Sequence, residues 1–178
     1  MKKTTFSILF ILFSLFLFSQ DLKPLDQGST IDFKLKNFGL NTGGSFSGLQ
    51  GIIHFDESNL STASFDVSLD ASSVNTGNDS RDNHLRDEDY FDVKKYPRIH
   101  FVSTTIKAGA KQNAFILSGK LTIKDITQEI SFPFLAKPSN EGYIFAGEFK
   151  INRKDFHIGG SSTLSDNVLI TLNVVTTK

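Results

Sequence analysis

The sequence contains no cysteine and no tryptophan, and it has one methionine and 4 prolines among 178 residues. The absence of cysteine excludes disulfides, thiol chemistry and a lipid-modified N-terminal cysteine. No charge of either sign is in excess, since 19 basic residues face 19 acidic ones. A chain without basic excess is not expected to bind nucleic acid, or to be held on an anionic lipid surface by charge alone.

Long apolar runs are also missing, except for one at the N-terminus. This run extends from Phe6 to Phe18, follows Lys2 and Lys3, and is succeeded by the small residue Ser19. That order predicts a secretory signal peptide over residues 1–19, and the run is shorter than the roughly 20 residues of a membrane-spanning helix. We therefore expect cleavage near Ser19, one domain over residues 20–178, and a periplasmic or secreted protein that does not span the membrane. A retained N-terminal anchor is the alternative.

Phenylalanine is the residue present in excess, with 18 copies beside 3 tyrosines. Such bulky, purely apolar rings either fill a core or line an apolar pocket. Composition does not separate the two.

Most of the remaining chain alternates apolar and polar residues with period two, which is typical of strands with one buried face. Ile31, Phe33 and Leu35 show the pattern clearly, as do the residues around Phe132. The pattern predicts eight strands, over residues 30–36, 45–55, 65–70, 98–106, 114–123, 129–134, 143–151 and 168–174. Gly48 and Gly51 mark bends in the second of these.

One segment, residues 76–95, lacks the alternation and is dense in charge. We interpret it as a helical or irregular crossover in which Asp79 or Ser80 caps a short helix, with Leu85 and Phe91 directed inward. The pairs Gly43–Gly44 and Gly159–Gly160 indicate turns or bulges, because a phosphate-binding loop would also need a lysine and a following helix.

Eight amphipathic strands favour a closed antiparallel barrel, because closure removes exposed sheet edges. An eight-stranded barrel has an interior that side chains fill or that holds one small ligand. An all-β barrel with one short helical crossover is therefore the predicted fold, and its interior stays undecided between a filled core and a container.

The residues do not predict catalysis. His54 and His100 belong to the polar side of their strands, and no G-x-S-x-G elbow occurs. His84 stands among carboxylates at Asp82, Asp87, Glu88 and Asp89, a group that is more typical of a solvated turn than of a metal site. We expect no enzyme activity, no metal and no cofactor.

The charged crossover also carries a family resemblance. The stretch SVNTGNDSRDNHLRDEDYFDVKKYPRIHFVSTTI, residues 73–106, resembles the signature region of the YceI-like family. Three further stretches resemble that family in the same order: GSFSGLQGIIHFD at 44–56, LSGKLTIKDIT at 117–127 and INRKDFHIG at 151–159. Asp125 and His157 depart from the pattern, since glycine is common in the family at both places.

The resemblance implies a lipocalin-like barrel that binds a polyisoprenoid, an isoprenoid quinone or a fatty-acid-like lipid, as an exported carrier or sequestering protein. A bound quinone would then be a ligand. The inward residues would form an apolar tunnel: Phe33, Leu35, Phe46, Phe65, Val67, Phe101, Phe115, Leu117, Phe132, Phe134, Phe145 and Phe149. Arg81, Asp82, His84 and Arg153 are the candidates for contacting a polar head group.

Alternatives remain open. Each tunnel residue is equally compatible with core packing, and Arg81 paired with a carboxylate would pin the crossover across the barrel. A filled barrel would be a structural or protein-interaction domain without a ligand. An enzyme acting on an exported lipid or glycan would depend on Asp82, His84 and Arg153. A homodimer is compatible with the sequence.

Overall fold

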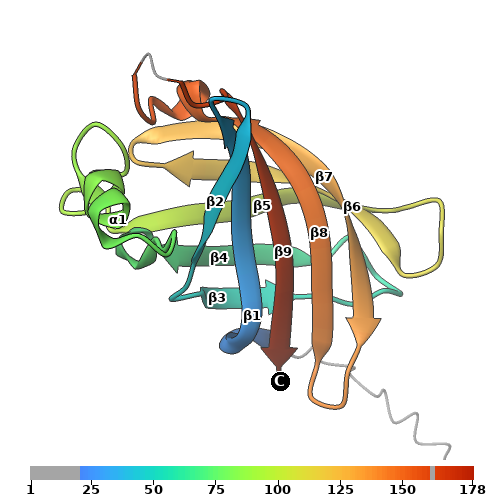
Figure 1. Cartoon of the computed structure of the whole chain (residues 1–178). Coiled ribbons are helices and arrows are strands. Elements are labelled where there is room, and N and C mark those ends of the chain that lie inside the picture. Colours follow the sequence, from blue (N-terminus) through green and yellow to red (C-terminus); the bar gives the residue numbers. More distant parts are fainter. Residues whose placement is uncertain (1–20, 161–162) are drawn as a thin grey trace, which may run out of the picture.

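The computed structural model describes residues 21–160 and 163–178, so the predicted signal peptide over residues 1–19 lies outside the described residues. Nearly all of the described chain is strand, in the arrangement of Figure 1. The strands are β1 (Asp21–Asn37), β2 (Leu40–Phe46), β3 (Gln50–His54), β4 (Ser64–Asp70), β5 (Arg98–Ala108), β6 (Ala114–Ile123), β7 (Ile126–Pro138), β8 (Tyr143–Asn152) and β9 (Asn167–Thr177).

Neighbouring strands pair antiparallel from β3 through to β9, and β9 pairs with β1 to close the sheet. β9 lies along one edge of β1, while β2 and β3 share the other edge, at residues 31–37 and 21–22 of β1. β2 and β3 are thus two halves of one barrel position, separated by a bend at Gly48, whose φ is 71°. The predicted eight-stranded antiparallel barrel is confirmed.

The first strand is longer than its alternation predicts. β1 begins at Asp21, nine residues before the predicted start at residue 30, and its register against β9 shifts between Leu25 and Thr30. Polar side chains stabilise this bulge: the Leu49 amide donates to Asp26 Oδ1 at 2.9 Å, and the Val175 amide donates to Ser29 Oγ at 2.9 Å. A bulge interrupts the period-two pattern, so the alternation does not predict this part of the strand.

The predicted crossover, residues 76–95, contains one short helix, α1 (Asp79–Arg86), and a 3₁₀ turn, η1 (Ala71–Ser73), precedes it. The helix cap is Asn78, whose Oδ1 accepts from the Arg81 amide at 3.0 Å, so the predicted cap at Asp79 or Ser80 was one or two residues late. Phe91 is buried and Leu85 faces the barrel interior, as predicted. α1 lies beside one end of the barrel, in the same part of the molecule as η2 (Arg153–Phe156) (Figure 1).

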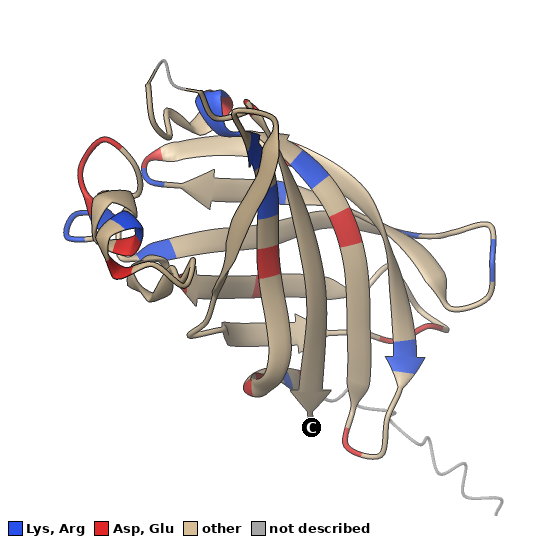
Figure 2. Ribbon diagram, viewed as in Figure 1, with Lys and Arg blue, Asp and Glu red and all other residues tan. Residues whose placement is uncertain are grey.

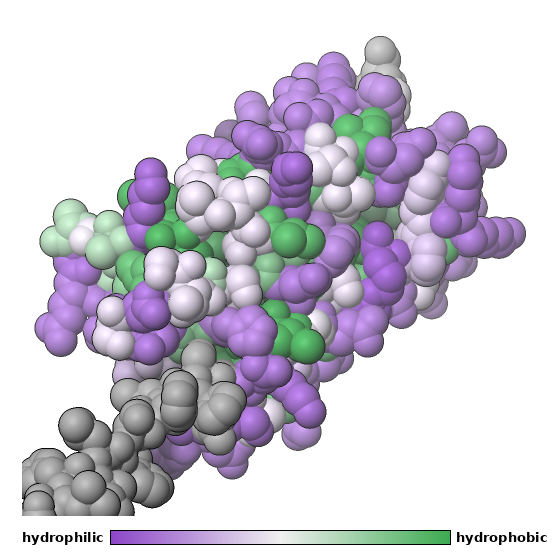
Figure 3. All heavy atoms as spheres, turned by 180° about the vertical axis from the view of Figure 1, so that it is seen from behind, coloured by the Kyte–Doolittle hydropathy of each residue, from purple (hydrophilic) through white to green (hydrophobic). Residues whose placement is uncertain are grey.

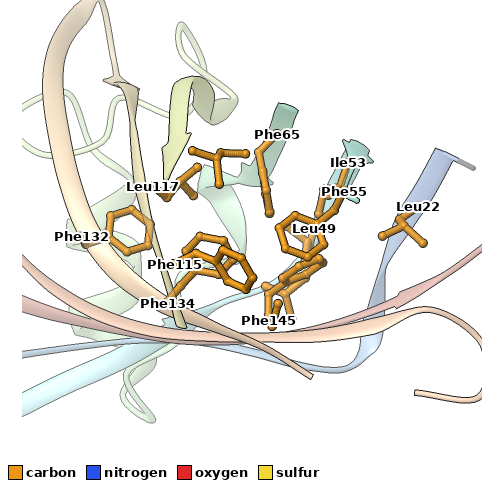
Figure 4. Close-up of a cluster of buried hydrophobic side chains, with 13 residues drawn as sticks. Leu22, Leu49, Ile53, Phe55, Phe65, Phe115, Leu117, Phe132, Phe134 and Phe145 are labelled. Carbon is orange, nitrogen blue, oxygen red and sulfur yellow. The ribbon is translucent and has the colours of Figure 1, made fainter. Parts of the chain in front are cut away.

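Two clusters of buried side chains occupy the barrel ends. At the end away from α1, Phe55 makes edge-to-face contacts with the rings of Phe115, Phe145 and Tyr143, each at 5.2 Å between centroids. Figure 4 shows this aromatic plug converging from several strands. At the α1 end, Phe91, Ile99 and Phe156 belong to the second cluster. The interior between them forms the candidate site.

Candidate functional site

The barrel contains a cavity of about 250 Å³ that extends from the aromatic plug towards α1. Its wall is almost entirely apolar and is built from every strand of the barrel. The structure places all of the predicted tunnel residues except Phe115 on this wall: Phe33, Leu35, Phe46, Phe65, Val67, Phe101, Leu117, Phe132, Phe134, Phe145 and Phe149. Whether they bind a ligand stays a prediction.

Several wall residues in the middle of the barrel are only half-buried. Val67, Phe101, Phe149, Ile170 and Leu172 point inward from four different strands, yet each keeps a partly accessible surface. In a filled barrel such residues would be covered completely, because protein interiors pack like organic crystals. The barrel is therefore hollow at mid-height.

Phe115 is buried but lies in the aromatic plug, stacked at a tilt on Phe134 with 5.4 Å between ring centroids. Alternation predicts which side of a strand a residue faces. It does not predict how far along the barrel axis that residue lies, and this separates Phe115 from the wall residues.

Two glycines make room for rings on the wall. A Cβ at Gly119 would lie 2.5 Å from the Phe101 ring, and one at Gly44 would lie 2.9 Å from the Phe33 ring and 2.4 Å from the Asn75 carbonyl oxygen. Gly43 and Gly44 lie within β2 and pair with β1 in unbroken register, so the predicted turn or bulge at this pair was wrong. Position 44 needs glycine because neighbouring groups approach it too closely for a Cβ. The chain does not change direction there.

Arg81 stands at the α1 end of the cavity and contributes to its wall. Its Nε and Nη2 donate to the hydroxyl and the carbonyl oxygen of Thr76, both at 2.8 Å, and its Nη1 reaches Thr42 Oγ1 at 3.4 Å. The guanidinium thus bridges from α1 to β2. This end forms the polar mouth of the cavity.

Asp82 and His84 turn away from the cavity. Asp82 is buried and accepts hydrogen bonds from the amide of Thr76, at 2.9 Å, and from the Thr76 hydroxyl. These bonds, the hydroxyl above all, hold the pKa of the Asp82 carboxyl below its ordinary value of 3.8, with Arg86 and Arg81 adding to the effect. The His84 side chain is 61% exposed, and its Nδ1 lies 3.9 Å from an Asp87 carboxylate oxygen.

Arg153, at the start of η2, is 3% exposed and borders the cavity. Its guanidinium donates to the carbonyl oxygens of Ile158 at 2.8 Å and Gly159 at 3.1 Å, and pairs with Asp166 at 3.2 Å. Further donors reach the carbonyl oxygens of Leu164 and Ser165. This side chain therefore organises the chain that precedes β9, over residues 158–160 and 163–166.

The departures from the family pattern fit local geometry. His157 has φ 51° and ψ 39°, the left-handed conformation in which glycine is favoured, and it closes η2. At the β6–β7 turn the left-handed residue is Lys124, with φ 58°, while Asp125 accepts a hydrogen bond from the Tyr96 hydroxyl at 3.0 Å. The fold accommodates both departures.

The two strand histidines lie on the outside, as predicted. His100 Nε2 is 2.6 Å from Asp66 and His54 Nδ1 is 2.9 Å from Asp21, and both histidines are at least 40% exposed. Within the ranges 21–160 and 163–178, no three His, Asp or Glu side chains converge in a manner suited to a metal ion. In the same ranges, no helix is long and apolar enough to cross a bilayer.

Sequence reasoning missed two kinds of wall residue. Some, such as Ile170 and Leu172, follow the predicted alternation but were not assigned to the tunnel, and others lie outside it. Leu49 lies in the bend between β2 and β3, Tyr90 follows α1, and Ile158 and Leu164 belong to the segment before β9. Thr42 was recognisable, because Thr42, Gly44 and Phe46 follow the period of a strand.

The fold and site together define a closed antiparallel barrel with an apolar interior and a polar mouth, the architecture of small lipid-binding barrels. The chain belongs to the YceI-like family, because the model of the YceI-like domain matches residues 23–176. A UPF0312 protein of Pseudomonas syringae pv. tomato is 31% identical over 149 residues, which cover 80% of this chain and 77% of the relative.

Solved structures agree on the fold. Burkholderia cenocepacia BcnA superposes with a TM-score of 0.81 at 24% identity, covering 87% of this chain and 99% of BcnA. A polyisoprenoid binding domain from Saccharophagus degradans superposes with a TM-score of 0.70 at 14% identity, covering 88% and 97% of the two chains. At these identities the likeness establishes the barrel and no more.

Proposed function

We propose that the protein is an exported carrier or sequestering protein that holds one long apolar molecule in its barrel. A polyisoprenoid, an isoprenoid quinone or a fatty-acid-like lipid has the required chemistry. The observation that supports this proposal most directly is the cavity of about 250 Å³, in which apolar wall residues at mid-barrel remain partly accessible. The polyisoprenoid binding domain of S. degradans supports the proposal at the level of fold, and the predicted signal peptide supports export.

Binding would come from removal of the ligand's chain from water. Each buried methylene contributes about 0.8 kcal/mol, so ten of them contribute about 8 kcal/mol before the cost of association is subtracted. Only the apolar wall contacts that chain. Selectivity should therefore follow chain length and width, and depend little on finer chemistry.

We assign the polar end of the ligand to the mouth at Arg81 and Thr42. The 3.4 Å contact between them is long for a hydrogen bond, so a ligand oxygen can replace the threonine hydroxyl as acceptor. Arg153 already donates to several carbonyl oxygens and would act on binding by holding the adjoining segment in place.

A series of saturated fatty acids of increasing length tests the proposal by titration calorimetry. Affinity should rise about fourfold per added methylene until the cavity is full, and then level off. Arg81→Gln should weaken every member of the series by a similar factor without changing that slope. Lys107→Gln, an exposed change on β5, is the matched control and should bind like the original protein. Absence of binding at every length, or an affinity independent of length, would contradict the proposal.

A further inference from the structure

The β1–β2 hairpin tip, Asn37–Leu40, exposes two large apolar side chains. Phe38 is 79% exposed and Leu40 is 74% exposed, more than any other large apolar residue in the part of the chain that the structure describes. Phe38 has φ 48° and Gly39 has φ 80°, so the tip is a two-residue turn of the type that favours Asn-Gly. A phenylalanine in the left-handed region is strained, and here it contributes nothing to the core. Neither turn geometry nor packing explains this residue.

The tip stands at the mouth of the cavity. Its two strands carry Leu35 and Thr42 of the cavity wall, which pair directly with one another. Leu40 is two residues from Thr42 and so projects from the same face of β2. The hairpin reaches the end of the barrel where α1 and η2 lie, away from the C-terminus (Figure 1). Apolar surface therefore continues from the cavity to the exposed tip.

Exposed lysines lie behind the tip on the outer wall. Lys34 of β1 and Lys150 of β8 flank Leu169 in register, and Lys36 is one step nearer the tip. None of the three forms an ion pair within residues 21–160 and 163–178. Asp32 of β1 and Glu148 of β8 pair with Thr171, one step farther from the mouth. Asp166, which precedes β9 on the mouth side, is paired with Arg153 and Lys154. Figure 2 shows the basic positions above the acidic ones.

An anionic bilayer fits this arrangement. Two apolar side chains alone give weak membrane binding, as does a small basic group alone, and the two signals together give stable attachment. Exposed acids at residues 87–89, across the mouth, would be repelled by the same surface. The barrel should thus dock tilted, with the β1–β8 wall towards the lipid and the α1 side lifted.

We infer that Phe38 and Leu40 insert into the interface of an anionic membrane, with Lys34, Lys36 and Lys150 on the headgroups, so that an apolar ligand passes between bilayer and cavity. The inference rests on the proposed function, since it supplies that function's route of loading. The inference goes beyond the proposed function by naming the membrane as partner and the residues that contact it.

Flotation with phosphatidylcholine vesicles, with and without phosphatidylglycerol, tests the docking. The original protein should float with the anionic vesicles and remain behind with the neutral ones. Phe38→Asn combined with Leu40→Ser should reduce flotation about tenfold or more. Each of Lys34→Gln and Lys36→Gln should reduce it about fivefold.

The matched control is Ile116→Ser with Leu135→Ser, on the outer wall of β6 and β7. These residues are 41% and 42% exposed. The view from behind shows that apolar side chains interrupt the hydrophilic surface in scattered places (Figure 3). The control should float like the original protein. Phe38→Asn introduces the residue that the turn favours, so thermal unfolding should show an unchanged or raised midpoint, and loss of flotation is then separate from loss of fold.

Ligand measurements distinguish this inference from the proposed function. The tip variant should keep the affinity for dissolved fatty acid while taking up a fluorescent fatty acid more slowly from anionic vesicles. No flotation of the original protein, or equal flotation of the tip variant, would overturn the docking even if affinity in solution is intact. A dimer in light scattering that the tip variant loses, without vesicle binding, would also overturn it, because a second copy would then cover the tip.

Discussion

Filling the cavity from one wall position should weaken binding strongly without damaging the fold. Val67, on β4, faces the cavity and pairs with Phe101, and part of its surface is uncovered. The benzyl side chain of phenylalanine exceeds valine's isopropyl group by about four carbon atoms, and each of them takes the place of ligand contact that contributes about 0.8 kcal/mol. Val67→Phe should therefore weaken binding of a cavity-filling fatty acid by about 3 kcal/mol, or about 200-fold.

Stability provides the second half of this test. In a hollow barrel the new ring occupies empty space, and the free energy of unfolding in urea should be unchanged or raised. In a packed barrel the same ring would destabilise the fold by about 1–3 kcal/mol. The control is Val102→Phe, the same change on β5 at a side chain that is 38% exposed on the outer wall. Lost stability in Val67→Phe, or binding lost equally in both variants, would refute the reasoning.

Two other predictions concern the residues around the mouth. Arg153→Lys should lower the free energy of unfolding by about 2–4 kcal/mol, because one ammonium group cannot donate to all the carbonyl oxygens that the guanidinium contacts. A urea titration measures this change. Lys154→Arg, at the exposed neighbour, is the control and should change the free energy of unfolding little. Asp82→Asn should destabilise the protein most at neutral pH. Because the pKa of Asp82 is lowered in the folded protein, its contribution to the free energy of unfolding is present above the ordinary value of 3.8 and is lost as pH falls through the folded-state pKa. The stabilities of the variant and the original protein should therefore converge in acid. A difference in stability that does not change with pH would count against this role.

The sequence was sufficient for the barrel because its signal is repetitive. Inward residues such as Phe33, Phe132 and Phe149 recur at period two, and one interior face follows from that period. Bulges and bends erase the same signal. For this reason residues 21–29 of β1 were not predicted. Residues 40–44 of β2 were missed because Gly43 and Gly44 carry no side chain that would show the alternation.

The candidate site was predictable in its apolar wall and much less so in its polar residues. A strand period determines the face of a wall residue, whereas the partners of a charged side chain depend on where distant segments meet. Arg81, Asp82 and His84 are neighbours in sequence, but helical geometry sends them to the mouth, to Thr76 and to solvent. The carbonyl partners of Arg153 belong to the backbone. Every residue has such a carbonyl, so the amino-acid sequence does not indicate which of them the guanidinium contacts.

Native mass spectrometry of the protein purified from its own organism tests the central claim most directly. We predict a bound species whose added mass is that of one lipid, which organic extraction removes and which does not accumulate on Val67→Phe. A protein recovered only at its own mass, which then takes up no long-chain lipid in vitro, would contradict the account.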